Sequence, residues 1–478
     1  MSQSVKEARR QQTQAEVKRL TKAVKSWFDR RVELDTDEKT KLYRAQYDSQ
    51  LNAVFNEVNG AAGIIAADLD KLVLADTKLG DVYTRCAQTD RRLVWLWRVF
   101  NFFSEKFDQR EDPKLGETLR AADEVVWSCY SPFFQNPTTA AKREPPPLPY
   151  IGTEYSPAAV RRDQTPGSLL KKGKDFDPLQ RYLDRLPIPI LQLPPNAVTA
   201  PWTLVLIGHE VGHFIQPLVQ QDPSYLVTFS TALESAVARA KGDKKEQQRW
   251  KNWAPEVFAD WYSVVCMGPW ALWVMAQFEI QDEPTMLVER SSYPSPLARL
   301  ALLAELTDRY LPTEGAKMFD DLGLKEMAAR YPKARDLTFV KEVATAVVES
   351  LPDEGKLENL LSFRKVEFEA KGEVEKRAAR LLAGNAGVIQ KDLRMARLIA
   401  AGSARAWSEI MKLPDLADRQ AAMDKLPQAL TDMIACAPPG KRAAPKPARA
   451  DQNPGNELAK ALGEIVESET VEPSIPLD

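Results

Sequence analysis

The spacing of apolar residues divides the chain into helical regions separated by one proline-rich stretch. Residues 1–135 carry amphipathic runs rich in Lys, Arg, Glu and Gln, a pattern typical of helices. Residues 136–200 contain clustered prolines and few spans compatible with a helix, which predicts an extended connector. Helical patterns return over residues 201–305 and 306–436. The pattern therefore predicts a mainly α-helical fold with at most a small edge sheet.

The connector and the last segment carry more specific predictions. Residues 188–193 alternate weakly and contain Pro189, which favours an edge strand and excludes a central one; a proline-rich wrap across the next domain is the alternative. Residues 437–478 contain few large apolar residues, which predicts a disordered tail with a short helix near residues 457–468. We thus expect five regions: a helical domain at 1–135, the connector, a core at 201–305, a helical region at 306–436 and the tail.

A helix is predicted shortly after the connector, with a second one about fifty residues later. Thr199 and Pro201 are start signals, the following residues up to 215 are largely apolar, and Pro217 marks the expected end. Pro255 suits the first turn of the second helix.

Residues 261–278 contain no charged side chain, over a length close to the lower limit for a membrane span. Gly268 and Pro269 divide this run into two shorter segments, and Asp260 stands immediately before it. We therefore expect two buried helices, with membrane insertion as the alternative.

Composition and charge narrow the class of protein. The 478 residues are 44% hydrophobic, enough for sizeable cores, and the net charge of −2 gives no overall attraction to nucleic acid or anionic lipid. Residues 1–10 lack the apolar core of a secretory signal. Cysteines stand at 86, 129, 266 and 436 without CxxC spacing, which argues against a disulfide framework or a zinc ribbon. These features predict a cytoplasmic protein in a reducing compartment.

The chain has only two histidines, and both lie in the pentapeptide His209-Glu210-Val211-Gly212-His213. Residues four apart share a helix face, so His209 and His213 can offer two nitrogens to one tetrahedral Zn²⁺. Glu210 then stands beside the metal, where its carboxylate can take a proton from a water molecule that the metal activates. The pattern predicts a zinc site; a core helix with two hydrogen-bonded histidines is the alternative.

Two histidines leave zinc short of ligands, and the third must be a carboxylate or a thiolate. Glu256, in the first turn of the second predicted helix, is the expected ligand, and Cys266 is the alternative. Asp260 lies one turn after Glu256 and can accept the remaining ring N–H of a ligand histidine. Apolar and aromatic neighbours surround both acids, although an ordinary amphipathic helix with two solvated acids is also possible.

These residues resemble a known group of enzymes. The His-Glu-x-x-His pentapeptide followed by Glu256-x-x-x-Asp260 resembles the gluzincin class of metallopeptidases, and the residues before Asp260 are similar to the M48 peptidase family. Residues 292–299 resemble that family's Ser/Thr-His-Pro segment, with Tyr293 in place of its histidine and Arg299 six residues later. The resemblance implies that both lie near the substrate carbonyl, where a phenol can stabilise an oxyanion. Alternatively, Tyr293 caps a turn and Arg299 pairs with a helix carboxylate.

The resemblance implies a zincin-like core over residues 201–305 and a zinc-dependent endopeptidase that cleaves a protein or peptide substrate with Glu210 as general base. No nucleic acid or membrane partner is expected, and a regulatory partner is left open. Two other functions stay open: a helical scaffold with a structural or inactive metal site, and a zinc amidohydrolase acting on a non-peptide substrate.

Overall fold

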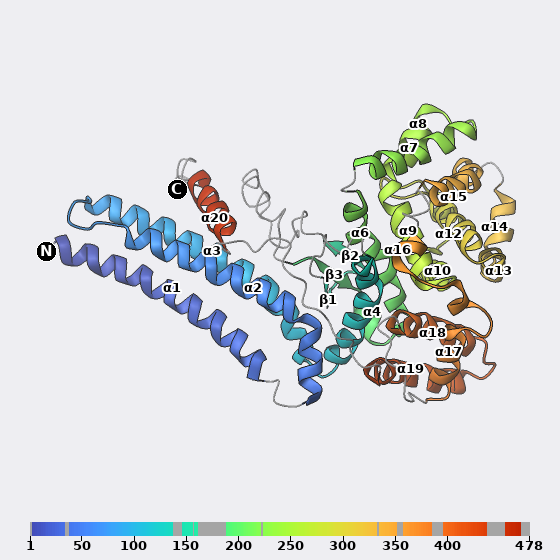
Figure 1. Ribbon diagram of the computed structural model, residues 1–478, viewed down its shortest axis with the longest axis horizontal. Helices are drawn as coiled ribbons and strands as arrows, with labels where there is room; N and C mark the ends of the chain where they lie inside the picture. The colour runs from blue at the N-terminus through green and yellow to red at the C-terminus, as the bar shows by residue number, and fades with distance from the viewer. Residues whose placement is uncertain are drawn as a thin grey trace. The chain divides into compact units, whose positions relative to one another are not determined.

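Helices dominate the computed structural model (Figure 1), which confirms the expectation of a mainly α-helical protein. The structure describes residues 2–33, 38–136, 146–155, 157–160, 188–220, 223–331, 334–350, 357–384, 395–436 and 455–469. The chain forms two compact units. Unit 1 consists of residues 1–111, 160–190 and 442–478, and unit 2 of residues 112–159 and 191–441.

Long helices with a coiled-coil type of spacing build unit 1. Its helices are α1 (Ser2–Glu33), α2 (Glu38–Asp70), α3 (Leu79–Asp108), the short 3-10 helix η2 (Gln109–Glu111) and α20 (Asn456–Glu469). Buried positions on α1 alternate between steps of four and three residues: Thr13, Val17, Leu20, Val24, Trp27 and Arg31. The buried series on α3 follows the same steps: Val82, Cys86, Thr89, Leu93, Leu96, Phe100, Phe103 and Phe107. Such spacing keeps one seam of each helix facing its neighbours.

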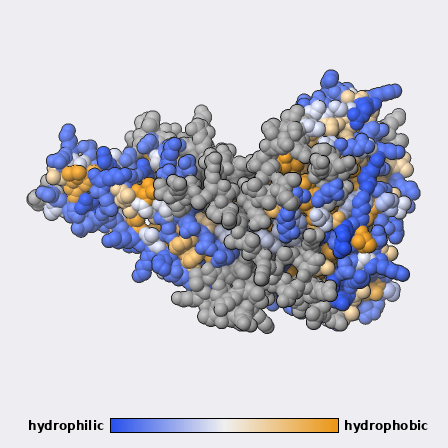
Figure 2. Space-filling model, viewed as in Figure 1, coloured by the Kyte–Doolittle hydropathy of each residue, from blue (hydrophilic) through white to orange (hydrophobic). Residues whose placement is uncertain are grey.

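The seam between α1 and α3 contains aromatic contacts. Trp27 packs edge-on against Phe100 and Phe107, with ring centroids 5.4 and 5.7 Å apart. Polar residues occupy the opposite helix faces, and Figure 2 shows a largely hydrophilic surface over these helices with small hydrophobic patches.

Helix α20 completes unit 1 by packing on α2 and α3. Its buried residues are Leu458, Ala459, Ala461, Leu462, Ile465 and Val466. Just before it, Gly455 adopts φ 84° and its N–H donates to Glu57 on α2. This is the short helix that the sequence indicated near residues 457–468; the rest of the predicted tail, 437–454 and 470–478, lies outside the described residues.

Unit 2 contains the remaining elements. Those before the histidine motif are α4 (Leu115–Gln135), β1 (Leu148–Ile151), β2 (Ala158–Val160), β3 (Ile190–Leu193), η5 (Pro195–Val198) and η6 (Pro201–Leu206). Those around the motif are α6 (Ile207–Gln220), α7 (Pro223–Arg239), α8 (Lys244–Asn252), α9 (Ala254–Met267), α10 (Trp270–Glu279), α11 (Glu283–Met286) and α12 (Pro296–Tyr310). Helix α4 belongs to this unit, so the division of the chain falls near residue 111 rather than near 135.

The last part of unit 2 consists of short helices. They are α13 (Glu314–Asp321), α14 (Leu324–Arg330), η7 (Arg335–Phe339), α15 (Val340–Glu349), α16 (Leu357–Leu361), η9 (Lys365–Phe368), α17 (Glu373–Leu382), α18 (Met395–Ile410) and α19 (Leu416–Cys436). One continuous hydrophobic core runs from α4 to α19 and includes α6, α9 and α12. The motif helices are therefore fixed inside the core.

The three strands form one small sheet in the order β1-β3-β2. The prediction of an edge strand at residues 188–193 is wrong, because β3 is the central strand. Pro189 stands one residue before the strand begins at Ile190. Its missing N–H therefore removes no hydrogen bond from the ladder.

The uncharged run at residues 261–278 forms parts of α9 and α10, and both helices are buried. Gly268 adopts φ 62° between them, as the sequence predicted for a break at this position. Among the described helices, none is both long and apolar enough to cross a membrane.

Helix α6 deviates from its predicted end, since it continues through Pro217 to Gln220. The proline removes one backbone hydrogen bond, but Phe214, Ile215, Leu218 and Val219 are all buried and hold this stretch in the core.

A glycine allows α6 to approach α9. A Cβ atom at Gly212 would lie only 2.8 Å from the Ala259 Cα atom, closer than real Cβ atoms are found. Gly212 therefore lets the backbones of the two motif helices come into contact.

Candidate metal centre

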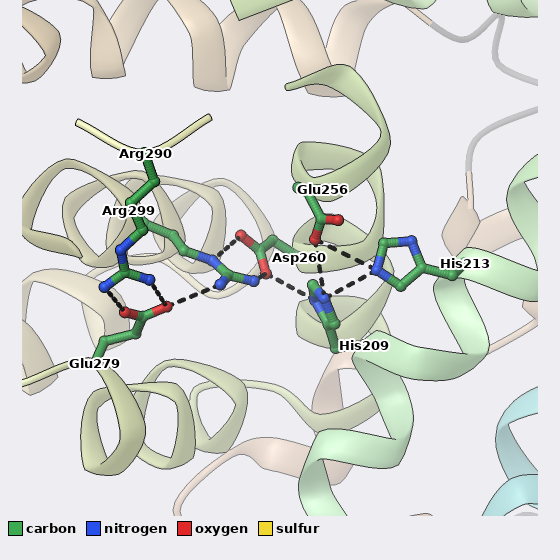
Figure 3. A network of polar contacts seen from close by, with 7 residues as sticks. All are labelled: His209, His213, Glu256, Asp260, Glu279, Arg290 and Arg299. Atoms are coloured by element: carbon green, nitrogen blue, oxygen red, sulfur yellow. Dashed lines mark hydrogen bonds and ion pairs between the residues drawn. The ribbon is translucent and has the colours of Figure 1, made fainter. Parts of the chain in front are cut away.

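Three side chains from α6 and α9 converge on one point (Figure 3). The Nε2 atoms of His209 and His213 are 3.1 Å apart. The Oε2 atom of Glu256 lies 3.3 Å from each of these nitrogens. Within the described part of the chain, these residues form the one group of three His, Cys, Asp or Glu side chains that could hold a metal ion.

The separations fit a tetrahedral zinc ion. Bonds of about 2.0–2.1 Å to zinc place neighbouring ligand atoms of a tetrahedron about 3.3–3.4 Å apart. The separations in the site are 3.1 and 3.3 Å. In addition, Glu256 Oε2 is buried, and its described contacts are the ring nitrogens of His209 and His213. A buried carboxylate oxygen needs a positive partner, which is either a protonated histidine or a metal ion.

The electrostatics of the three ligands also favour a cation. Burial lowers the pKa of His209, but its contacts with Asp260 and Glu256 outweigh burial and raise it to about 10. The histidines in turn overcome the burial of Glu256 and hold the pKa of its carboxyl below the ordinary value. Without a metal, the site thus attracts a proton at neutral pH, and zinc has to displace that proton.

Asp260 lies one turn along α9 from Glu256, on the other side of His209. Its Oδ1 atom is 2.8 Å from His209 Nδ1. Burial opposes ionisation of Asp260, but Arg299 and His209 outweigh it and keep the pKa of the carboxyl below its ordinary value. An ionised Asp260 favours the proton on Nδ1, so that Nε2 is the free ligand atom.

Arg299, near the start of α12, is almost entirely buried, at 4% exposure. Its Nε and Nη2 donate to the two oxygens of Asp260, at 2.9 and 2.8 Å. Its Nη1 donates to Glu279 Oε1 at 2.9 Å. Arg299 therefore binds two helix carboxylates, as the second interpretation of the sequence expected, and it also lines the cavity next to His209.

Two residues of this network, Glu279 and Arg290, escaped the sequence analysis. Glu279, the last residue of α10, accepts hydrogen bonds from Arg299 and from Arg290, which lies in the loop between α11 and α12. No motif contains either residue. The one available signal is position, since Glu279 is the first charged residue after the uncharged run at 261–278.

Glu210 and Tyr293 line a cavity of about 290 Å³ next to His209. Burial raises the pKa of the Glu210 carboxyl, against the opposing effect of the two histidines. Burial also raises the pKa of Tyr293 to about 12, so its phenol keeps its proton at neutral pH. Arg299 Cζ lies over the Tyr293 ring, 4.6 Å from the ring centroid. The cavity thus contains a buried carboxyl and a hydrogen-bond donor.

Carboxyl groups outnumber arginines around the cavity and the ligands. Four carboxyl groups (Glu210, Glu256, Asp260 and Glu279) face two guanidinium groups (Arg290 and Arg299). Without a metal, a proton on His209 offsets part of this difference, and a divalent cation would take its place.

Cys266, the alternative ligand, lies elsewhere on α9 and is fully buried. Its carbonyl oxygen accepts a hydrogen bond from Arg397. Burial is the main cause that raises the pKa of its thiol, and the neighbouring Cys129 raises it further. Cys266 therefore lacks the thiolate character of a metal ligand.

Comparisons with protein-family models, with curated proteins and with solved structures found no match to this chain.

Proposed function

We propose that this protein is a zinc-dependent endopeptidase whose zincin-like core contains α6, α9 and α12. The observation that carries the proposal is the convergence of His209, His213 and Glu256 at tetrahedral spacing. Glu210 lies next to these ligands on α6 and lines the adjoining cavity. A purely structural zinc site has no use for a buried carboxyl at an open cavity.

Zinc held by these three side chains would supply Lewis acidity, which lowers the pKa of water and polarises a carbonyl group. Glu210 would accept a proton from the attacking water and pass it to the leaving amine. Its raised pKa suits this exchange, because a carboxyl that titrates closer to neutral pH both takes up and releases protons readily. The protonated phenol of Tyr293 would donate a hydrogen bond to the developing oxyanion.

The cavity supports a peptide as the substrate. Its volume of about 290 Å³ is at the lower end for ligand pockets, enough for one side chain rather than a large cofactor. Leu206, Met275 and Phe278 contribute apolar surface close to His209 and Glu210. One residue of an extended chain can enter it while the rest of the chain stays outside.

We propose the cytoplasm, a reducing compartment, as the location, because the four cysteines of the sequence lack the spacing of a disulfide framework.

Metal analysis of purified protein tests the ligand set. We expect about one zinc per wild-type chain and none in His213→Ala or Glu256→Ala, because two remaining ligands hold zinc weakly. Glu326→Gln is the matched control, since the Glu326 side chain is 84% exposed and far from any proposed role. Wild-type protein that stays free of zinc after reloading would overturn the proposal.

Peptide hydrolysis tests the mechanism. Glu210→Gln should bind zinc as the wild type does and should lose roughly 10²–10⁴-fold in kcat, the range for a general base. Profiling with a peptide library and, separately, with small amides distinguishes a peptidase from an amidohydrolase. Retained cleavage by Glu210→Gln would exclude this mechanism.

A further inference from the structure

We propose that Glu279 is a positioning residue that sets the geometry of the metal centre through Arg299 and Asp260. The inference rests on the proposed zinc site and adds a residue that no motif contains. The structure places the carboxylate of Glu279 between two arginines, one leading to the metal ligand His209 and the other to the loop that carries Tyr293 (Figure 3).

The first step runs from Asp260 to the metal ligand. Asp260 Oδ1 contacts both His209 Nδ1 and Arg299 Nη2, each at 2.8 Å, while Oδ2 accepts from Arg299 Nε at 2.9 Å. Two parallel bonds from one guanidinium fix the rotation of the carboxylate. Arg299 thereby determines where Asp260 Oδ1 points, and Oδ1 orients the His209 ring.

The second step concerns what holds Arg299. Its side chain is only 5% exposed, so water cannot satisfy or steer the guanidinium. Glu279 Oε1 accepts from Arg299 Nη1 at 2.9 Å, the one guanidinium nitrogen that does not bind Asp260. Glu279 therefore fixes the in-plane position of a cation whose other two hydrogen bonds define Asp260.

The third step links Glu279 to the substrate side. Arg290 binds the same carboxylate through Nη2 at 2.7 Å and Nη1 at 3.3 Å. Arg290 and Tyr293 lie in one loop between α11 and α12, and both line the cavity. One carboxylate thus contacts both Arg299, which orients Asp260, and Arg290 in the loop that carries the proposed oxyanion donor.

The location of Glu279 argues against a role in stability alone. It is 5% exposed and ends α10, where the helix dipole disfavours a negative charge. Apolar groups of similar shape often stabilise a core better than a buried ion pair does. A role in orienting the metal ligands explains why a charged residue occupies this position.

The experiment measures metal binding rather than activity alone. In Glu279→Gln we expect zinc affinity, measured by competition with a chelating dye, to fall about 10-fold, at the lower end of the effect of residues behind the ligands. The visible spectrum of the Co²⁺-loaded variant should shift, because the ligand geometry changes. Glu279→Asp keeps the charge but shortens the side chain by one methylene group, so its zinc affinity and Co²⁺ spectrum should change in the same direction by a smaller amount.

Arg290→Gln tests the link from Glu279 to the Tyr293 loop separately from the link through Arg299 to Asp260. It should leave zinc affinity and the Co²⁺ spectrum close to wild type, while lowering kcat for a peptide substrate more than it raises KM, because the loop carries the proposed oxyanion donor. Glu326→Gln again serves as the control for removing a surface carboxylate.

The failures of the two proposals are distinguishable. If wild-type protein binds neither zinc nor Co²⁺, the proposed function itself is wrong. If wild type binds both, but Glu279→Gln shows unchanged affinity and spectrum, the metal site stands and the positioning role is wrong. Should Glu279→Gln fail to fold, Glu279→Asp decides, since an unchanged spectrum and affinity in that folded variant contradict the proposal.

Discussion

Both units of this protein bury an arginine, but they do so in different ways. In unit 1, the Arg31 side chain is 3% exposed and pairs with Asp108 and Glu111, whose side chains are 43% and 39% exposed. In unit 2, the Arg299 side chain is 5% exposed and its partners Asp260 and Glu279 are only 2% and 7% exposed. Water therefore reaches the carboxylates of the first cluster and hardly reaches those of the second.

The difference indicates what each cluster is for. Arg31 covers the end of a helical seam and faces acids at the surface. Burial of the guanidinium lowers its pKa to about 10, but water still solvates both of its partners. The second cluster removes several charges from water, which rarely stabilises a fold. The charged groups of this second cluster lie beside the candidate metal centre. We therefore connect them with function rather than with stability.

Removing the central cation should have the largest effect. Arg299→Met leaves Asp260 and Glu279 buried without their shared partner and should destabilise unit 2 by about 3–5 kcal/mol. Arg31→Met should cost about 1 kcal/mol or less, because water can solvate Asp108 and Glu111. Denaturant unfolding combined with hydrogen exchange in α9 and α3 measures the two losses separately. Equal losses in the two variants would contradict the contrast between the units.

A pair of glycine substitutions sharpens the comparison. A Cβ at Gly212 meets the Ala259 backbone at 2.8 Å, so Gly212→Ala should separate α6 from α9 and cost about 1–3 kcal/mol. A Cβ at Gly63 on α2 meets nothing within 4 Å, so Gly63→Ala should stabilise α2 by about 0.5–1 kcal/mol. Thermal unfolding gives both values. Zinc affinity should fall in Gly212→Ala alone, and a loss in both variants would refute the assignment of close packing to the motif helices.

The smallest expected effect concerns a buried lysine in unit 1. Lys106 on α3 donates to the Phe102 carbonyl, and burial lowers its pKa from 10.5 to about 8. Between these two pH values the unfolded chain binds the proton and the folded chain does not, so wild-type stability should rise with pH across this window. Below pH 8 the cost of burying the charge is fully present.

Lys106→Met removes that cost. The variant should be more stable than wild type by on the order of 1 kcal/mol at pH 7, and its advantage should fade as the pH approaches 10.5. Paired denaturant titrations at several pH values provide the measurement. A gain that stays constant with pH would show that packing, and not the charge, is responsible.

Local sequence signals predicted much of the fold around the site. Pro255 marks the first turn of α9, and Gly268 with Pro269 separates α9 from α10, as expected. The sequence also placed His209, Glu210 and His213 on one helix and Glu256 with Asp260 on another. These predictions succeed because each depends on a few consecutive residues whose backbone preferences are strong.

Other features depend on partners distant in sequence, and for these local signals failed. Pro217 indicated a helix end, but burial of its neighbours in the core outweighed the lost hydrogen bond. Pro189 indicated an edge strand, although the position of the strand's first residue decides whether a proline disturbs the ladder. Arg299 reaches Asp260 across 39 residues and Glu279 across 20, and no periodicity encodes such side-chain pairs.

Helix α20 has a consequence for the order in which the chain folds. It packs on α2 and α3 of unit 1, and the hydrogen bond from Gly455 to Glu57 spans 398 residues. Unit 2 is therefore inserted, in sequence, between parts of unit 1. During synthesis, the apolar positions of α2 and α3 that receive α20 emerge from the ribosome long before their cover. We expect unit 2 to reach its native structure first, with closure of unit 1 as the last step of biogenesis.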